Sequence, residues 1–265
     1  MILLAEQKDE KGQVIGQAIL FKNWLRNLAV PLTSLNNDEK KSASTTDTVL
    51  TKSQLALKNL FSPTTILEKI DEKKDGSKNS TDEKESASTA LLASCKKLET
   101  KVYPFGLKQN RAMWACGDKG TFHGFRGVNI DIHEWTPEIK QVREKLDTEF
   151  GIYTNFCLLN HYRDGSDSIA PHADGELFAE KKSVFTLSLG GTRKMNLVSA
   201  TAKNKNGNIV FDLDHGDLFW MWGNIQDYWK HGIDAVSPAS SILPRWSLTF
   251  RSTLLKKCSQ NKKLL

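Results

Sequence analysis

Hydrophobic positions recur at helical spacing in one clear stretch, before the chain becomes strand-like. In residues 136–150, Ile139, Val142, Leu146 and Phe150 fall on one face of an α-helix. The two ends carry residues that start and stop helices, namely an N-cap, a first-turn proline and a terminal glycine: Thr136, Pro137 and Gly151. The pattern predicts an amphipathic helix whose buried stripe supports a sheet.

From residue 153 onward, short runs of hydrophobic residues predict β-strands. The clearest run is 245–251, where Trp246, Leu248 and Phe250 share one face and polar side chains share the other. Asn206-Gly207 is a strong hairpin-turn signal. Many short strands separated by turns are typical of a β-sandwich or barrel. The expected strands are residues 154–162, 183–189, 194–198, 209–213, 218–222 and 245–252.

The first 97 residues show two other patterns. Within residues 1–35, Trp24, Leu25 and Leu28 follow Phe21 at helical spacing, so we expect a short helical segment that packs on the main domain. Residues 36–97 are rich in Lys, Glu, Asp, Ser and Thr. Such a composition buries too little apolar surface to offset the entropy of ordering. We expect this segment to be largely disordered, with a short ordered stretch near 50–70.

The ordered stretch contains a peptide pattern with two interpretations. Residues 54–61 nearly match the Gln-x-x-Leu-x-x-aromatic-aromatic peptide that docks on sliding clamps, with Leu60 in place of the first aromatic residue. A sliding clamp is therefore one hypothetical partner. The interpretation that we favour is an entry strand of the main domain, followed by a helix at 65–70 that Ser62 or Thr64 caps.

Composition narrows the class of protein. A net charge of +6 and a pI of about 9.0 favour an acidic partner such as nucleic acid, and they also fit plain solubility. Four cysteines without a Cys-x-x-Cys pair form no readable zinc or disulfide framework. No apolar run approaches the roughly 20 residues of a membrane span. We expect a monomeric intracellular protein that does not associate with a membrane. The sequence does not distinguish the nucleus from the cytoplasm.

Two His-x-Asp pairs are candidates for metal chemistry. In a strand, His172 and Asp174 would aim an imidazole and a carboxylate to one side. One distant histidine would complete the two-His, one-carboxylate triad of non-haem Fe(II) oxygenases. His215 and Asp217 have the same spacing, so spacing alone does not choose between the pairs. The polar face of 245–251 carries two arginines, which suit a small dicarboxylate.

Taken together, these motifs resemble the AlkB family of Fe(II)/2-oxoglutarate-dependent dioxygenases over roughly residues 98–255. The matching stretches follow one another in order: Arg111, Gly117-Asp118-x-Gly120, Asn160-x-Tyr162 with Asp164-Gly165, His172-x-Asp174-x-Glu176, Leu187-Ser188-Leu189-Gly190 with Arg193, His215-Gly216-Asp217, Trp229-Lys230-His231, and Arg245-x-Ser247-x-Thr249-Phe250-Arg251.

The resemblance implies a fold, a set of cofactors and a set of ligands. The fold would be mainly β with flanking helices around a double-stranded β-helix, or jelly-roll, core. Residues 98–255 would form the dioxygenase domain and 256–265 a basic tail. Fe(II), 2-oxoglutarate as cosubstrate and O₂ would be required. The implied metal ligands, and so the catalytic residues, are His172, Asp174 and His231, while the His215 motif would be structural.

The resemblance also implies how the cosubstrate is held. Arg245 would pair with the distal carboxylate of 2-oxoglutarate, with the Tyr162 hydroxyl as a second partner. Asn160 and Arg251 would lie at the metal-bound end, and Ser247 replaces an asparagine that is common there. For each arginine, a structural ion pair is the alternative.

The implied substrate is a flipped or unpaired base of DNA or RNA. Residues 98–134 interleave aromatic residues with Arg and Gly, as in a lid that stacks on a base, and a β-meander with buried aromatics is the alternative. Glu176 would contact a cationic methylated base, or is a solvated loop acid. Arg193 would contact either the substrate backbone or the loop that carries Glu176. The expected substrate-binding residues are Arg111, Trp114, Phe125, Glu176 and Arg193.

The expected activity is therefore oxidative demethylation of N-alkylated bases of the 1-methyladenine or 3-methylcytosine type, in nucleic-acid repair. Two alternatives stay open. One is a non-catalytic jelly-roll module that binds nucleic acid. The other is an AlkB-like oxygenase that acts on a substrate other than nucleic acid.

Overall fold

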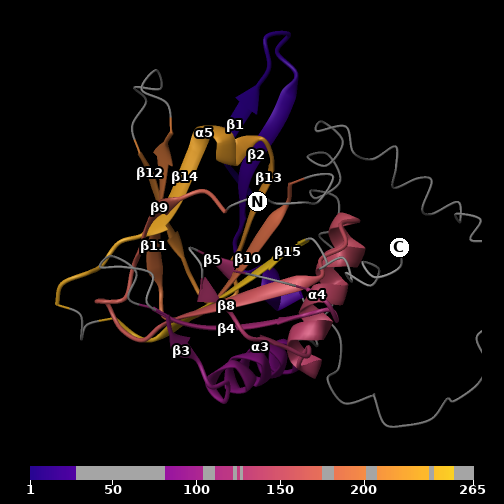
Figure 1. Ribbon diagram of the computed structural model, residues 1–265, viewed down its shortest axis with the longest axis vertical. Coiled ribbons are helices and arrows are strands. Elements are labelled where there is room, and N and C mark those ends of the chain that lie inside the picture. The colour runs from indigo at the N-terminus through magenta and orange to yellow at the C-terminus, as the bar shows by residue number, and fades with distance from the viewer. Residues whose placement is uncertain are drawn as a thin grey trace, which may run out of the picture.

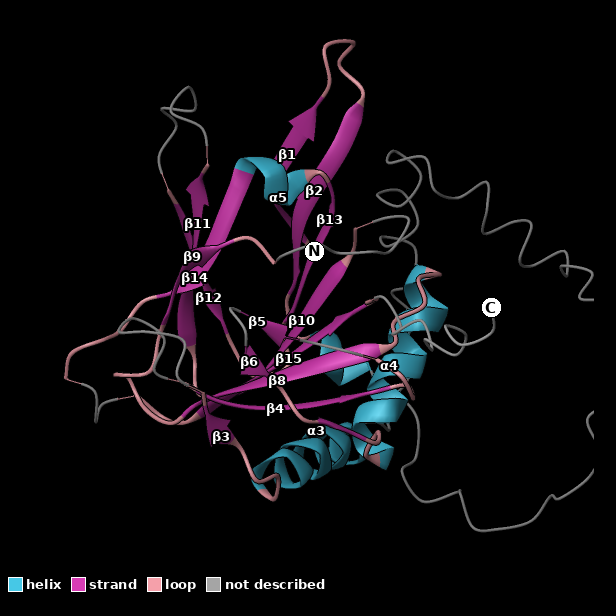
Figure 2. Cartoon of the chain, viewed as in Figure 1, coloured by secondary structure: helices cyan, strands magenta, loops and turns pink. Residues whose placement is uncertain are grey.

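A computed structural model gives the fold of the chain. It describes residues 1–27, 81–103, 111–121, 124–125, 128–174, 182–200, 208–238 and 242–253. Two β-sheets lie against each other, and the two longer helices cover the outer side of the larger sheet (Figure 1). The cartoon in Figure 2 shows the same division, with the two longer helices gathered on one side of the strands.

The larger sheet has nine strands. All of its neighbours pair antiparallel except β7 (Ile132–His133), which pairs parallel with β4. The other strands run in the order β1 (Ile2–Lys8), β2 (Val14–Phe21), β13 (Leu218–Gly223), β10 (Val184–Gly190), β15 (Arg245–Arg251), β8 (Phe156–Tyr162), β4 (Ala112–Gly117) and β3 (Lys101–Val102).

The smaller sheet has four antiparallel strands, in the order β12 (Ile209–Leu213), β11 (Arg193–Ser199), β14 (Trp229–Ile233) and β9 (Ile169–His172). Along the chain, β8, β10, β13 and β15 belong to the larger sheet. The strands between them belong to the smaller sheet. This alternation is the winding of a double-stranded β-helix, so the predicted jelly-roll core is confirmed. A separate two-stranded sheet joins β5 (Gly124–Phe125) and β6 (Val128–Asn129).

The two longer helices that flank the sheets are α3 (Thr81–Lys96) and α4 (Pro137–Phe150). Two shorter elements are the 3₁₀ helix η1 (Trp24–Asn27) and the single helical turn α5 (Ile225–Tyr228). In α4 the Thr136 hydroxyl accepts the Ile139 N–H, and Gly151 ends the helix at φ 62°. The four apolar residues expected to be buried on α4 are buried. Within the described residues, no helix is both long and apolar enough to cross a membrane.

Strand alternation decides what each side of the larger sheet does. On β15, Trp246, Leu248 and Phe250 join the core beneath the helices, as predicted. Arg245 and Ser247 point to the other side, where the two sheets enclose a pocket. The polar positions of this strand are nevertheless buried, because the smaller sheet covers them.

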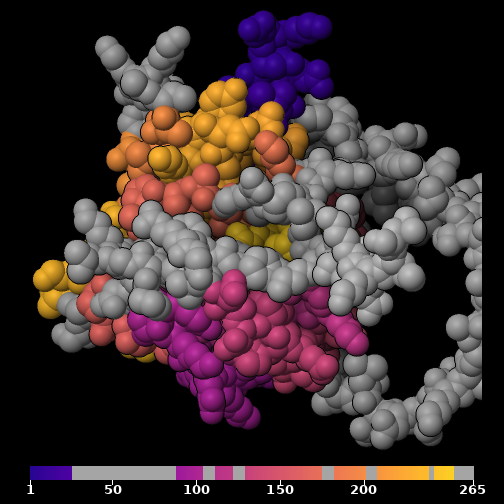
Figure 3. Space-filling view, in the orientation of Figure 1, coloured from indigo at the N-terminus to yellow at the C-terminus, as the bar shows by residue number. Residues whose placement is uncertain are grey.

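The helical segment predicted in residues 1–35 is mostly a β-hairpin in its described part, residues 1–27. Residues 14–21 form β2, which pairs with β1 and with β13, and the helical part of these described residues is η1. Ile19 packs in the core beneath the helices, whereas Ala18 and Leu20 pack between the sheets. A strand buried on both faces has a continuous apolar run, which periodicity alone does not distinguish from a helix. The hairpin projects from the body of the molecule in Figure 3.

Part of the predicted disordered segment is ordered. Residues 81–96 form α3, where Leu91 and Cys95 are buried in the same core as α4. The Ser94 hydroxyl also donates to Glu138 of α4 over 2.9 Å. Tertiary packing of a few apolar side chains thus outweighs a polar composition.

Several other expectations lie outside the described residues. These are the clamp-like peptide 54–61, the ordered stretch near 50–70, the helix at 65–70, the turn at Asn206-Gly207 and the tail 256–265. The strands on either side of that turn do pair, with Leu197 opposite Ile209.

Candidate metal centre and anion pocket

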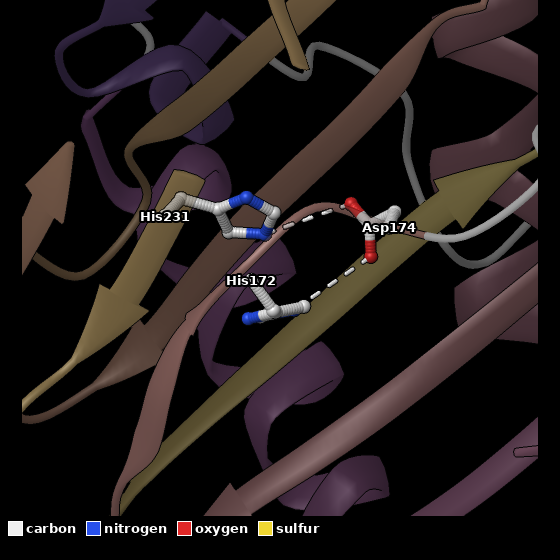
Figure 4. Close-up of side chains that lie close together, drawn as sticks. All are labelled: His172, Asp174 and His231. Carbon is white, nitrogen blue, oxygen red and sulfur yellow. Dashed lines mark ion pairs between the residues drawn. The ribbon is translucent and has the colours of Figure 1, made fainter. Parts of the chain in front are cut away.

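Three side chains converge at one end of the smaller sheet. The ligand atoms of His172, Asp174 and His231 all lie within 4.8 Å of one another. The Asp174 carboxylate stands 3.6 Å from His231 Nε2 and 3.9 Å from His172 Nε2. Figure 4 shows the two imidazoles and the carboxylate pointing toward a common centre. This is the geometry expected of a metal triad.

Strand pairing brings the distant histidine into place. His172 ends β9 and lies directly opposite His231 in the antiparallel pair of β9 and β14. The ring centroids of the two histidines are 4.3 Å apart. Asp174 follows just beyond the end of β9, and its Oδ1 accepts a hydrogen bond of 3.0 Å from Arg251 Nη1. The register of β9 and β14 thus brings together two histidines that lie far apart in the sequence.

The electrostatics of the cluster suit a cation. Burial, together with a smaller effect of the neighbouring His172, lowers the pKa of His231 to about 4 against the opposing pull of Asp174. Burial also lowers the pKa of His172. Both imidazoles are therefore neutral at pH 7, which is the form that binds metals. His172 Nδ1 lies 3.1 Å from the Ala170 carbonyl, so Nδ1 carries the proton and Nε2 offers its lone pair toward Asp174.

The competing His215 motif is structural. The Asp217 carboxylate is fully buried and accepts from Lys22, from the Asn23 N–H and from the Asp214 N–H. His215 Nδ1 accepts the Gly190 N–H over 3.0 Å. These bonds fasten the turn before β13 to its neighbours and leave this pair without metal geometry. The choice made from the resemblance agrees with this arrangement.

A buried cation stands in the same pocket as the triad. Arg245 is 1% exposed, and its Nε donates to Ser188 Oγ over 2.8 Å. Its two terminal nitrogens have no hydrogen-bond partner among the described residues. Burial lowers the pKa of Arg245 to about 10, with a smaller lowering from Arg193 and an opposing effect of the Tyr162 hydroxyl, whose ring lies 5.3 Å from the guanidinium carbon. A guanidinium with two open donors and no carboxylate partner fits an anionic ligand.

The pocket wall between the triad and Arg245 is built from paired strands. Asn160 on β8 lies opposite Ser247 on β15, and Tyr162 lies opposite Arg245. The side-chain Oδ1 of Asn160 accepts a 2.6 Å hydrogen bond from Arg111 Nε, and Arg111 also lines the pocket. The pocket is lined by Arg111, Leu158, Asn160, Tyr162, Ile169, His172, Asp174, Thr186, Met195, His231, Gly232, Ile233, Arg245, Ser247 and Thr249.

Arg193 was expected at the substrate, and the structure corrects this prediction. Its side chain is 2% exposed. Its terminal nitrogens donate to the carbonyls of Asp164, Asp167 and Asp234 at 3.0, 2.9 and 2.6 Å. Arg193 therefore ties two loops together from within. Its position three residues after the Leu187–Gly190 stretch carries no signal that separates this role from substrate binding.

Trp114 was also expected to contact substrate, and the structure places it elsewhere. It lies on β4, opposite Leu159 of β8, on the side of the sheet that faces the helices. Its ring stacks on His133 with 5.0 Å between centroids. Residues 112–117 thus form a strand that pairs with β8 and β3 and holds its aromatic side chain in the core, rather than part of a lid. Arg111 faces the pocket because it has the opposite parity on this strand.

Two expected substrate contacts lie outside the described residues. Phe125 lies in β5, but its side chain is outside them, and Glu176 falls in the gap 175–181. Sequence reasoning missed Ser188, the partner of Arg245, although the Leu187–Gly190 stretch that contains it was recognised. It also missed Gln226, which accepts the Asp174 N–H over 2.8 Å and belongs to no motif.

Comparison with known proteins agrees with this geometry. Residues 56–251 match the model of the 2OG-Fe(II) oxygenase superfamily. The human DNA oxidative demethylase ALKBH2 is 29% identical over 53% of this chain and 56% of its own length. The human alpha-ketoglutarate-dependent dioxygenase alkB homolog 3 is 30% identical over 44% of this chain and 43% of its own length. The chain thus spans about half the length of these curated relatives.

Among solved structures, OsALKBH1 aligns with a TM-score of 0.45 and 17% identity, over 64% of this chain and 92% of that chain. The family model covers most of the chain, including the triad and both strand arginines. The cofactors of this superfamily are Fe(II), 2-oxoglutarate and O₂, in keeping with the His-Asp-His cluster. The chain belongs to the 2OG-Fe(II) oxygenase superfamily and, within it, to the AlkB family.

Proposed function

We propose that this dioxygenase oxidatively demethylates N-alkylated bases in nucleic acid, of the 1-methyladenine or 3-methylcytosine type. One observation carries the proposal. A single pocket holds two neutral imidazoles beside the Asp174 carboxylate and, in its wall, a buried guanidinium with two open donors. The first feature fits a divalent metal, and the second fits the free carboxylate of a bound dicarboxylate.

Each member of the pocket has a defined task in this proposal. His172, Asp174 and His231 would hold the iron, and Arg251 would orient the Asp174 carboxylate through their 3.0 Å bond. Arg245 would grip the distal carboxylate of 2-oxoglutarate. When bound, iron with 2-oxoglutarate and O₂ supplies the oxidation of an N-methyl group to N-hydroxymethyl, with succinate and CO₂ as coproducts. The N-hydroxymethyl group then leaves as formaldehyde.

The remaining wall residues would position the cosubstrate and limit water. Asn160 and Ser247 face each other across β8 and β15 at the centre of the wall. Arg111 holds the Asn160 amide in one orientation, since its Nε–H requires the amide oxygen. The apolar side chains of Leu158, Ile169 and Met195 line the pocket beside these polar groups. They keep bulk water from competing for the Arg245 donors, which strengthens charge pairing.

The choice of nucleic acid as substrate rests on the relatives and on charge. The human, bovine and mouse relatives named DNA oxidative demethylase ALKBH2 are 28–29% identical to this chain. The net charge of +6 suits a polyanion. Arg111 is the expected substrate residue that faces the pocket among those whose side chains are described, and it remains a proposed contact.

The test is formaldehyde release from a single-stranded oligonucleotide that carries 1-methyladenine or 3-methylcytosine, with Fe(II), 2-oxoglutarate and O₂. The parent protein and a His133→Ala control should release formaldehyde, because His133 lies outside the pocket lining. A His172→Ala variant should not. A thermal melt of each variant shows that it is folded.

Other outcomes have defined meanings. Succinate formation without formaldehyde, abolished by His172→Ala, would refute the base substrate and leave an AlkB-like oxygenase of another substrate. If neither product forms while metal is bound, the enzyme proposal fails and a non-catalytic nucleic-acid-binding module takes its place.

A further inference from the structure

Gln226 makes a long-range contact with the metal cluster. It lies in α5, the single turn between β13 and β14, and its Oε1 accepts the backbone N–H of Asp174 over 2.8 Å. β9 ends at His172, so Asp174 lies past the last residue of the strand. Gln226 therefore holds the chain at the point where it leaves the strand and delivers the carboxylate.

The amide of Gln226 has only one workable orientation. A backbone N–H needs an acceptor, so the carbonyl oxygen must face Asp174 and the NH₂ group must point away. That Nε2 is buried and has no hydrogen-bond partner among the described residues. A buried donor without a partner lowers stability. An apolar side chain would avoid this cost, so the amide is better explained by what its oxygen holds than by packing.

Asp174 is fixed at two points by this arrangement. Arg251 Nη1 binds carboxylate Oδ1 at 3.0 Å, and Gln226 binds the backbone N–H of the same residue. The first contact sets where the carboxylate points. The second sets where its Cα stands relative to His231, because α5 leads directly into β14. Two of the three cluster residues are thereby tied through one side chain.

The N-terminal hairpin holds α5 in place. The Asn224 N–H donates to the Ile15 carbonyl over 2.8 Å. A Cβ at Gly16 would stand 2.5 Å from the Ile225 nitrogen, so β2 and α5 meet backbone to backbone. Ile225 is 1% exposed and packs in the cluster that contains Ala18 of β2. The hairpin thus supports the turn that carries Gln226.

We propose that Gln226 is a positioning residue for the Asp174 metal ligand, and that the hairpin β1–β2 supports the metal centre through α5. The inference rests on the proposed function, since it takes the His-Asp-His cluster as the iron site. A variant without the Gln226 acceptor should still fold. Its Asp174 carboxylate should no longer be held in position to bind the metal.

The test measures metal affinity rather than turnover. Fe(II) is titrated without oxygen into protein with 2-oxoglutarate, and the visible charge-transfer band is followed. Gln226→Met should weaken Fe(II) binding by about 10- to 100-fold, as for other residues that orient metal ligands. Gln226→Glu keeps the acceptor and should bind at least as tightly as the parent. Gln7→Met is the matched control, because the Gln7 side chain lies on the hairpin and its Nε2 donates to the neighbouring Lys8 carbonyl.

The outcomes separate the two proposals. If the parent and Gln7→Met bind no Fe(II), the iron site itself fails and this inference falls with it. If the parent binds and Gln226→Met binds within about twofold of it, only the positioning role is overturned. Equal weakening in Gln226→Met and Gln226→Glu would also overturn it, because the acceptor would not matter. Should Gln226→Met not fold, Gln226→Asn, whose shorter amide cannot reach Asp174, replaces it in the same comparison.

Discussion

Arg245 and Arg193 are both buried arginines, and we expect methionine to have opposite effects at the two positions. At Arg245, the two terminal nitrogens are buried without partners. The pKa falls from 12.5 to about 10 through burial, which corresponds to about 3 kcal/mol against the charged form. A cation with a lowered pKa destabilises the folded state at every pH below the folded pKa, so this cost is fully present at pH 7.

Arg245→Met removes that cost and loses the bond to Ser188, which is worth about 1 kcal/mol. The metal-free protein should therefore gain about 1–2 kcal/mol, or about 2–8 °C in Tm for a chain of this size. Binding of 2-oxoglutarate should be lost at the same time, because the guanidinium that would hold its distal carboxylate is gone.

Arg193→Met is the matched control. The terminal nitrogens of Arg193 donate to the carbonyls of Asp164, Asp167 and Asp234. Its loss leaves these acceptors without their donor. The acceptor in a buried residue, the Asp167 carbonyl, costs about 1–3 kcal/mol when it has no donor. We expect a loss of about 1–3 kcal/mol, or about 2–12 °C in Tm.

The assay is thermal unfolding at pH 7 of the metal-free proteins, repeated with Mn(II) and 2-oxoglutarate. Mn(II) and 2-oxoglutarate should each raise the Tm of the parent protein. In Arg245→Met, Mn(II) should still raise the Tm, and 2-oxoglutarate should add nothing to it. The reasoning is refuted if Arg245→Met loses as much stability as Arg193→Met. Arg245 would then have a structural partner, and the anion pocket would have no free cation.

Three further predictions concern other parts of the fold. The pKa of His231 is lowered to about 4, so the unfolded chain takes up a proton below about pH 6.5 while the folded chain does not. Metal-free protein should therefore lose about 2 kcal/mol between pH 7 and pH 5 in urea titrations, and His231→Gln should flatten that dependence. Gly16→Ala places a Cβ 2.5 Å from the Ile225 nitrogen and should lower the free energy of unfolding by about 1–3 kcal/mol. Gly12→Ala has open space around its Cβ, so only its φ of 79° should lower stability, by about 1–2 kcal/mol, and its Fe(II) affinity should be unchanged. Trp114→Ala should lower stability by about 3–5 kcal/mol in calorimetry, since the ring packs beneath the helices. If Trp114→Ala instead raised the KM for the oligonucleotide and left stability unchanged, Trp114 would be a substrate-binding residue.

Local features of the sequence were enough for the elements with a strict period. The stripe and caps of α4 follow from spacing and from the residues at its ends. The alternation in Arg245–Arg251 correctly divides the strand into a core face and a polar face. In each case the relevant interactions lie within a few residues of one another, which is why pattern alone predicts them.

Other outcomes depended on contacts between distant segments. Residues 14–21 became a strand because the edge of β13 was open to pair with them, and no period in the sequence records that edge. Residues 81–96 became a helix through packing of Leu91 and Cys95 on distant elements. Both depend on burial that only the assembled core provides.

The roles of the arginines show the same division at the site. The sequence by itself determined that Arg193, Arg245 and Arg251 stand near the motifs of an Fe(II) oxygenase. Only the tertiary structure decided that Arg193 donates to backbone carbonyls and that Arg251 donates to the Asp174 carboxylate. It also decided that the two terminal nitrogens of Arg245 have no acceptor among the described residues. The physical reason is that a strand fixes the side to which a guanidinium points, whereas its partners come from loops and strands far away in the chain.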